Sequence, residues 1–244
     1  MTLLKLSVTT RPRTRMAWRA AMIGVAVLGS AVTVAAQQDG RVFIGVNGGL
    51  QASSTDFTDN IVFTEFVEEG DLDAAYSIDS GVIIDIGGGF KLLDNLGIGI
   101  GFSRFDKSND AAVDARIPHP FFFDHHRSIA GSTTGLTRTE TAVHIQVRWF
   151  TSVLDQVDLS LFVGPTFFNL TQGLVTAVDF SHSYPFDEAS FTSADTGDQS
   201  ASAVGFHVGA DVGFFFSRNV GVGALVRFSG ATVDLVSEDV RMDG

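Results

Sequence analysis

The densest group of residues able to bind a metal ion lies between Pro118 and His126, in the run PHPFFFDHH. His119, Asp124, His125 and His126 offer three imidazoles and one carboxylate within eight residues, and transition metals accept such ligands. Successive side chains of a strand point to opposite faces, so the adjacent histidines rarely reach the same ion. We therefore expect no metal site here.

Nucleophilic catalysis has one candidate set in the same region. Ser128, His125 and Asp124 supply a hydroxyl, an imidazole and a carboxylate, the groups of a catalytic triad. The chain has no cysteine, which excludes disulfides, thiol catalysis and Cys-ligated zinc. Neither a G-x-G-x-x-G nor a Walker motif is present, so we expect no cofactor and no enzymatic activity.

A second group of ionisable residues is spread along the chain, and its chemistry depends on the elements that carry it. In the segment 141–150 (TAVHIQVRWF), every second residue from Val143 is apolar, and the residues between them are polar. Because strand side chains alternate between two faces, this pattern predicts a strand with one apolar face. The same alternation predicts strands near 42–50, 82–90, 96–102, 161–167, 204–214 and 220–228.

The composition of the two faces predicts the architecture. One face is uniformly large and apolar, which suits lipid, whereas the other carries Gly, Ser, Thr, His, Asp and Arg, which suit a narrow interior. We expect an all-β, antiparallel, up-and-down transmembrane β-barrel; a soluble sandwich is the alternative. Interior charges tend to pair, so we expect a structural polar network of Asp85, Lys91, His144, Arg148, His207, Asp211 and Arg227.

The predicted connections support this orientation. Short ones (92–95, 152–158, 217–219) alternate with long ones (53–77, 106–138, 180–200), and outer-membrane barrels combine short periplasmic turns with long outer loops. Aromatic residues fall near both ends of the strands and predict two girdles. Phe90, Trp149 and Phe214 would lie at the periplasmic rim, and Phe102, Phe167 and Phe228 toward the outer rim.

Residues 1–36 have the features of a secretory signal. A basic segment without acidic residues precedes a run of seventeen small or apolar residues that ends at Ala36. All 28 acidic residues follow Ala36, together with 11 of the 16 basic ones, and this negative balance repels nucleic acid. We expect a signal peptide over 1–36 and a barrel domain over 37–244.

The strand count is odd, although bacterial single-chain barrels have an even number. We therefore expect eight strands, with the last strand missing from this chain as a C-terminal truncation. Strands 42–50 and 220–228 should then be separated by a gap one strand wide.

Several segments, FIGVNGGL from Phe43, GVIIDIGGGF from Gly81 and LGIGIGFSRF from Leu96 among them, resemble small outer-membrane β-barrel proteins. The class is typified by the transmembrane domain of outer-membrane protein A. The resemblance implies residence in the bacterial outer membrane, contact with lipid and lipopolysaccharide, and insertion by the barrel assembly machinery.

The expected role is structural or surface-interacting, without catalysis. One alternative is an adhesin that binds an unidentified ligand through long acidic loops, since residues 56–73 hold seven acidic residues and no basic one. The second alternative is a lipid-modifying enzyme. The run Phe121–Phe123 would pack on the barrel rim, enter the lipid interface or contact a partner.

Overall fold

The computed structural model describes residues 2–5, 23–25, 31–35, 41–51, 55–217 and 220–231. Its strands form one antiparallel sheet, and among the described residues no helix is long and apolar enough to cross a membrane. The all-β, antiparallel prediction is confirmed. The strands are β1 (Thr2–Lys5), β2 (Ile23–Val25), β3 (Ala31–Ala35), β4 (Val42–Gln51), β5 (Thr55–Glu65), β6 (Glu68–Ile78), β7 (Gly81–Leu93), β8 (Leu96–Pro118), β9 (His126–Leu154), β10 (Val157–His182), β11 (Ala189–Phe215) and β12 (Val220–Ala231).

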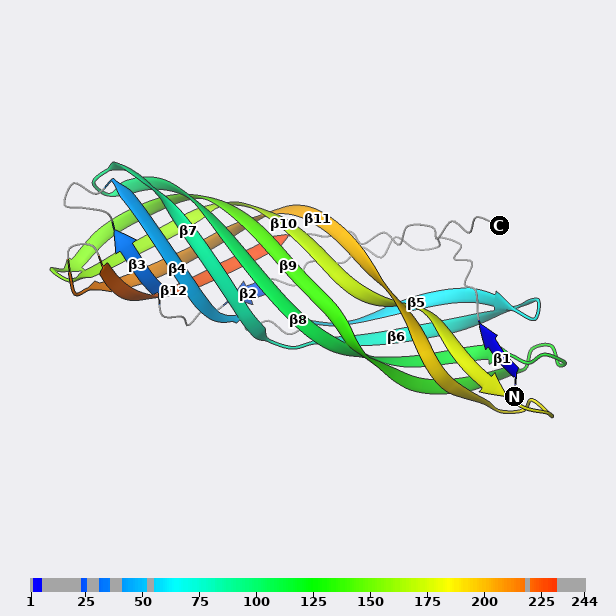
Figure 1. Cartoon of the computed structure of the whole chain (residues 1–244). Helices are drawn as coiled ribbons and strands as arrows, with labels where there is room; N and C mark the ends of the chain where they lie inside the picture. The colour runs from blue at the N-terminus through cyan, green and yellow to red at the C-terminus, as the bar shows by residue number, and fades with distance from the viewer. Residues whose placement is uncertain are drawn as a thin grey trace.

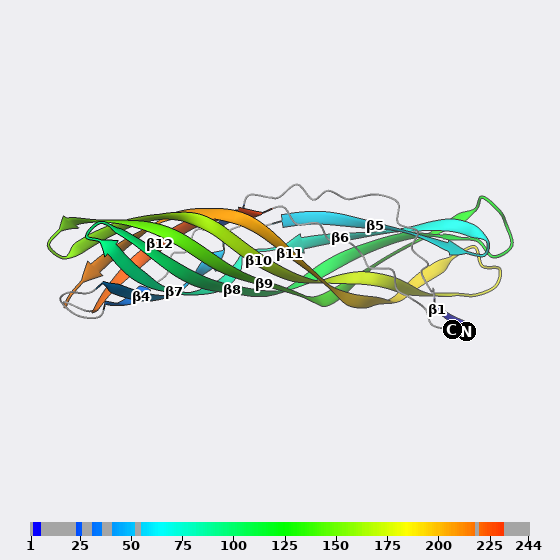
Figure 2. The same cartoon turned by 90° about the horizontal axis from the view of Figure 1, so that it is seen from above.

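Most strands pair with their neighbours in sequence. β7 to β12 form successive antiparallel hairpins, and β4 pairs with β7. The hairpin of β5 and β6 lies between β4 and β7 in the sequence, but in the sheet β6 pairs with the part of β8 farther from the short turns. Figures 1 and 2 show this hairpin beside only one half of the molecule, away from the short turns. We call that half the extension.

The sequence analysis expected a gap one strand wide between β4 and β12, but in the structure an N-terminal strand lies in that gap. β3 lies between them and pairs with Val220–Gly223 on one side and Phe43–Val46 on the other. β2 pairs with Arg227–Ser229. Both short strands belong to the predicted signal segment, so the sheet formed by residues 42–231 does not close into a barrel by itself. The expected cleavage point at Gln37 and the residues after 231 lie outside the described part of the chain.

The expectation of long loops is wrong for most of residues 53–77, 106–138 and 180–200. β5 and β6 occupy the first segment, while β8, β9, β10 and β11 extend through much of the other two. These segments also alternate, but with reversed polarity: on β8, Asp106 and Asp114 are exposed, whereas Val113 and Ile117 are buried. The acidic residues suggested loops, although most of them lie on the outer face of strands.

The extension has its own apolar core. The backbone pairing between β9 and β10 ends at Arg138 and Gln172, and beyond it β5, β6, β8 and β9 face β10 and β11 across that core. The phenol oxygen of Tyr76 accepts a hydrogen bond from the Val175 backbone N–H at 2.8 Å and links the two layers. The core is formed by Phe63, Leu72, Ala74, Tyr76, Ala111, Val113, Ala115, Ile117, Ile129, Leu136, Val175, Val178 and Phe180.

Candidate functional site

The interior charges meet on the inner faces of strands far apart in sequence. Nη1 of Arg227 on β12 lies 2.6 Å from Oδ2 of Asp85 on β7, and both side chains are almost completely buried. Asn47 on β4 donates to the other carboxylate oxygen of Asp85 at 3.3 Å. The carboxylate therefore joins three strands.

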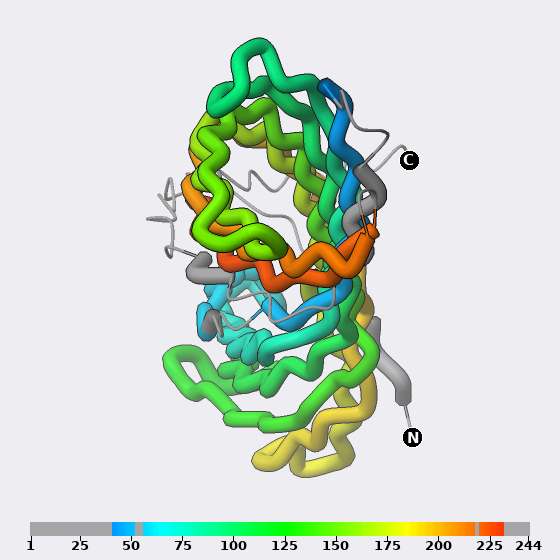
Figure 3. Tube along the Cα trace, turned by 90° about the vertical axis from the view of Figure 1, so that its left-hand side faces the viewer, coloured from blue at the N-terminus to red at the C-terminus, as the bar shows by residue number. Residues whose placement is uncertain are grey.

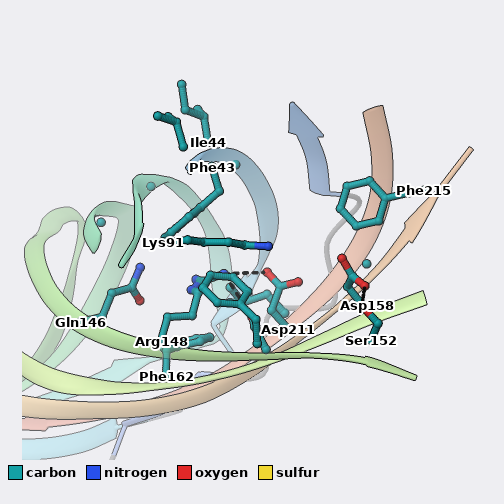
Figure 4. Close-up of a pocket in the computed structure, with 18 of the residues that line it drawn as sticks. Phe43, Ile44, Lys91, Gln146, Arg148, Ser152, Asp158, Phe162, Asp211 and Phe215 are labelled. Carbon is teal, nitrogen blue, oxygen red and sulfur yellow. Dashed lines mark hydrogen bonds and ion pairs between the residues drawn. The ribbon is translucent and has the colours of Figure 1, made fainter. Parts of the chain in front are cut away.

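A second charged pair lies nearer the short turns. Nη1 of Arg148 is 3.7 Å from Oδ2 of Asp211 and donates to the Ser160 hydroxyl at 3.2 Å. Its guanidinium also lies 5.2 Å from the ring centroid of Phe43 and 4.8 Å from that of Phe162. Figure 4 shows Arg148 and Asp211, with Phe43 and Phe162, converging from different strands. Aromatic faces and a carboxylate together stabilise the partly buried cation.

A chain of alternating hydroxyls and imidazoles runs between β8 and β11. Ser103 Oγ lies 3.0 Å from Nε2 of His144, Nδ1 of His144 lies 2.9 Å from Thr166 Oγ1, and that hydroxyl lies 2.8 Å from Nδ1 of His207. All four residues are buried. Ser103 and His144 form a nucleophile–base pair in composition, but the second imidazole nitrogen faces a threonine instead of the carboxylate of a triad. The four side chains link β8, β9, β10 and β11 through buried hydrogen bonds.

The structure brings together six of the seven predicted interior residues, namely Asp85, His144, Arg148, His207, Asp211 and Arg227. Lys91, at the short-turn end of β7, lines the same cavity as Asp85, Arg148, Asp211 and Arg227, and its ammonium is 4.6 Å from the Phe150 ring centroid. The sequence analysis missed Asn47, Ser103, Ser160 and Thr166. Each lies at an inward position of its strand, so the alternation would have identified them.

The sequence analysis expected a narrow interior, but the short-turn half contains a cavity of about 1160 Å³. Arg148, Asp211, Asp85 and Arg227 line it, together with turn residues such as Asp94. Glycines on the inner faces, including Gly45, Gly87, Gly101 and Gly213, leave this space open. Figure 3 views this end of the molecule, where the strands surround the interior.

A second polar cluster lies farther along the interior, toward the extension. Nε of Arg138 donates to Oε1 of Glu140 at 2.6 Å, and Nη1 of Arg138 donates to the Gln172 side chain at 3.2 Å. Gln51 on β4 donates to the other oxygen of Glu140 at 3.2 Å. The sequence analysis assigned Arg138 to the end of a loop and did not predict this cluster.

The outward face changes polarity at one level across four strands. The last apolar row consists of Phe102, Val143, Phe167 and Val204, whose backbones pair in that order. Two residues farther along each strand, the outward face is polar on all four: Arg104, Thr141, Asn169 and Ser202. The strands continue through this level without a break, so the change of polarity follows the register and not the end of an element.

All six predicted girdle residues lie on the outer face, between 43% and 58% exposed. Phe90, Trp149 and Phe214 lie near the short turns at the ends of β7, β9 and β11. Phe102 and Phe167 belong to the last apolar row, and Phe228 pairs with Val208. Their assignment to two membrane interfaces stays a prediction.

The histidines between Pro118 and His126 have separate roles. His119 is buried, and its Nδ1 accepts hydrogen bonds from the backbone N–H groups of Phe121 and Phe122 at 3.1 and 3.3 Å. Nε2 of His126 lies 3.0 Å from the Glu69 carbonyl oxygen. Within the described ranges, no group of three or more His, Cys, Asp or Glu side chains is arranged to hold a metal ion.

No family model matches this chain, and no curated protein matches it. Among solved structures, a bacterial polysaccharide outer membrane secretin aligns with 87% of this chain and 99% of its own, at 9% identity and a TM-score of 0.11. A TM-score this low does not indicate a shared fold.

Proposed function

We propose that this protein is an integral β-barrel protein of the bacterial outer membrane, related to the small barrels that its sequence resembles. Its role is structural or surface-interacting, without catalysis. The barrel has eight strand positions: β4 and β7–β12 fill seven, and the eighth is the position that β3 occupies between β4 and β12. Lipid and lipopolysaccharide surround its apolar outer face, and the barrel assembly machinery inserts it.

The polarity reversal on the outer face is the observation that carries this proposal. On the short-turn side of the row from Phe102 to Val204, the outward residues are large, apolar and exposed, whereas the interior holds Arg227, Asp85 and their partners. A protein in water would leave all these apolar side chains bare. A bilayer covers them, and the polar residues beyond the row then lie in water.

The position of the short turns gives the orientation of the barrel in the membrane. If the short turns face the periplasm, as in known outer-membrane barrels, the extension projects from the cell surface. Its apolar core lies inside and its acidic side chains outside, which is the arrangement that water requires.

Membrane fractionation with limited proteolysis tests the proposal. We expect the full-length product in the outer-membrane fraction and resistant to alkaline carbonate. Protease added to intact cells should cleave only in the extension, at turns such as 183–188. Lipid A should be unchanged by expression. Recovery as a soluble periplasmic protein would overturn the proposal, and altered lipid A would favour the lipid-modifying enzyme.

A further inference from the structure

Three turns of the extension meet at its tip, which we define as residues 65–69, 118–127 and 182–188. The Asp124 backbone N–H donates to Oε1 of Glu68 at 2.7 Å and joins the first two segments. The rings of Phe121 and Phe186 lie 5.5 Å apart in an edge-to-face arrangement and join the second and third. The three turns therefore form one continuous surface.

A buried arginine holds this surface together. Arg127 is 3% exposed and donates to the Pro118 carbonyl at 2.9 Å, the Phe186 carbonyl at 3.2 Å and Nδ1 of His182 at 2.9 Å. A buried cation needs such partners, because its desolvation is costly. The acceptors come from two different turns, so the tip has a defined shape before it meets any partner.

Large apolar side chains protrude from this rigid frame. Val67, Phe121, Phe122, Phe123 and Tyr184 are between 61% and 89% exposed. They lie at the opposite end of the molecule from the short turns, beyond the polar outer face of the extension (Figure 1). The membrane that would surround the apolar outer face near the short turns therefore does not cover them. Contiguous exposed aromatics of this kind mark interaction surfaces.

The rim of the patch is acidic. Glu69, Asp124, Asp187 and Glu188 are exposed at the tip. The cation within the tip, Arg127, is buried, and the nearby Arg116 lies 2.7 Å from Asp71. This potential repels nucleic acids and anionic lipid headgroups and attracts a basic surface.

We propose that the tip is a preformed docking site for a protein surface with an apolar centre and a basic rim. The inference deepens the proposed surface-interacting role and rests on it only for placing the tip outside the cell. The aromatic side chains supply the buried contact and the carboxylates select the partner's charge. Because Arg127 fixes the turns in advance, little ordering is needed on binding.

The test uses full-length protein and two synthetic peptides, one alternating Leu and Lys and the other alternating Leu and Glu. We expect the Leu–Lys peptide to bind at least tenfold more tightly. The triple variant Phe121→Ser, Phe122→Ser, Phe123→Ser should lose at least tenfold of that affinity, and Asp187→Lys with Glu188→Lys should also weaken it. The matched control, Val153→Ser with Leu154→Ser, removes exposed apolar residues at the opposite end and should bind as the unmodified protein does.

Equal binding by the triple variant and the unmodified protein would overturn the proposal, as would equal binding of the two peptides. Equal adsorption of the unmodified protein and the triple variant to zwitterionic vesicles excludes lipid as the tip's ligand and supports the proposal, whereas Phe-dependent adsorption would overturn it. Unchanged urea midpoints show that the variants are folded. Peptide binding is measured in whichever fraction contains the protein, so its result is distinct from that of the membrane-location test.

Discussion

Nη1 of Arg227 lies 2.6 Å from Oδ2 of Asp85, and this buried ion pair joins β12 to β7 across the interior. The two residues are 142 positions apart in the chain. Asp85 also accepts a hydrogen bond from Asn47 on β4, the strand that pairs with β7 on its other side. The pair therefore connects the first and last long strands of the sheet through a single carboxylate.

Removing one partner of this pair should destabilise the protein strongly. Arg227→Leu leaves the Asp85 carboxylate buried without its cation, and we expect unfolding in vesicles to become easier by about 3–5 kcal/mol. The double variant Arg227→Leu with Asp85→Leu removes both charges and should recover most of that loss. Urea titrations of the four proteins measure the coupling. Additive effects of the two single changes would contradict a direct ion pair.

Val208 and Thr196 test the proposed membrane boundary on one strand. Both are exposed on the outer face of β11, Val208 on the apolar side of the boundary and Thr196 on the polar side. Val208→Arg should impair insertion, since a charge on the lipid face near the midplane costs about 2–4 kcal/mol. Thr196→Arg places the same charge in water and should insert normally. Yields of folded protein in vesicles give the comparison, and equal yields would show that the outer face does not meet lipid.

Gly209 is a poor site for any side chain, although its inward position alone suggests that Ser would be tolerated. A Cβ at residue 209 would overlap the Phe162 ring and the carbonyl oxygen of Val226. At Gly101, also inward, the nearest atom to a new Cβ is Cβ of His144 at 3.6 Å, an ordinary contact. Gly209→Ala should therefore cost about 1–3 kcal/mol, and Gly101→Ala much less. The urea midpoints of the two variants decide this, and a reversed order would show that the interior relaxes around residue 209.

The alternation predicts strands well and their ends poorly. Ile98 and Ile100 alternate with glycines, so the near half of β8 follows from the sequence. Past Arg104 the same strand continues with polar residues outward and apolar residues inward, and that reversed pattern carries so many acids that composition suggested a loop. The same alternate residues face outward along the whole strand. We propose that this outward face meets lipid near the short turns and water in the extension.

The site was predictable in its members but not in its connections. Their positions in the alternation of apolar and polar residues identify His144, His207 and Arg227 as interior residues from the sequence alone. It does not say that Thr166 lies between the two imidazoles, because that depends on the register of three strands. The frame at the tip was not foreseen, since Arg127 was assigned to a loop and its acceptors come from distant turns.

Processing of the N-terminus links the predicted signal to the position between β4 and β12. We expect N-terminal sequencing of the membrane protein to give Gln37 or a residue close to it. A chain that begins there lacks β3, so Phe43–Val46 and Val220–Gly223 lose their ladder partners on one side. In bilayers, each backbone group without a partner costs several kcal/mol.

Hydrogen exchange should reveal those edges. Amides of 43–46 and 220–223 should exchange at least tenfold faster in a 37–244 chain than in the 1–244 chain, unless another strand occupies the position. Residues 98–102, which pair with β7 and β9 in both chains, are the control. A retained Met1 would show that residues 1–36 act as an anchor.

Tyr76 makes the stability of the extension sensitive to alkali. Burial raises the pKa of its phenol from 10.0 to about 12, an effect that the hydrogen bond from the Val175 N–H opposes and Asp59 reinforces. In the unfolded chain the Tyr76 phenol ionises near its ordinary pKa of 10.0, whereas in the folded chain it stays protonated until about pH 12. The free energy of unfolding therefore falls as pH rises from about 10 toward 12. The chain has two tyrosines, so tyrosinate absorbance of a Tyr184→Phe variant reports Tyr76 alone. We expect a midpoint near 12 in the folded protein and near 10 in denaturant.

Tyr76→Phe should abolish this loss of stability above pH 10, although it leaves the Val175 N–H without its partner and so lowers stability at neutral pH by about 1–3 kcal/mol. A folded-state midpoint near 10 would show that water reaches the phenol and that the two layers of the extension do not enclose it.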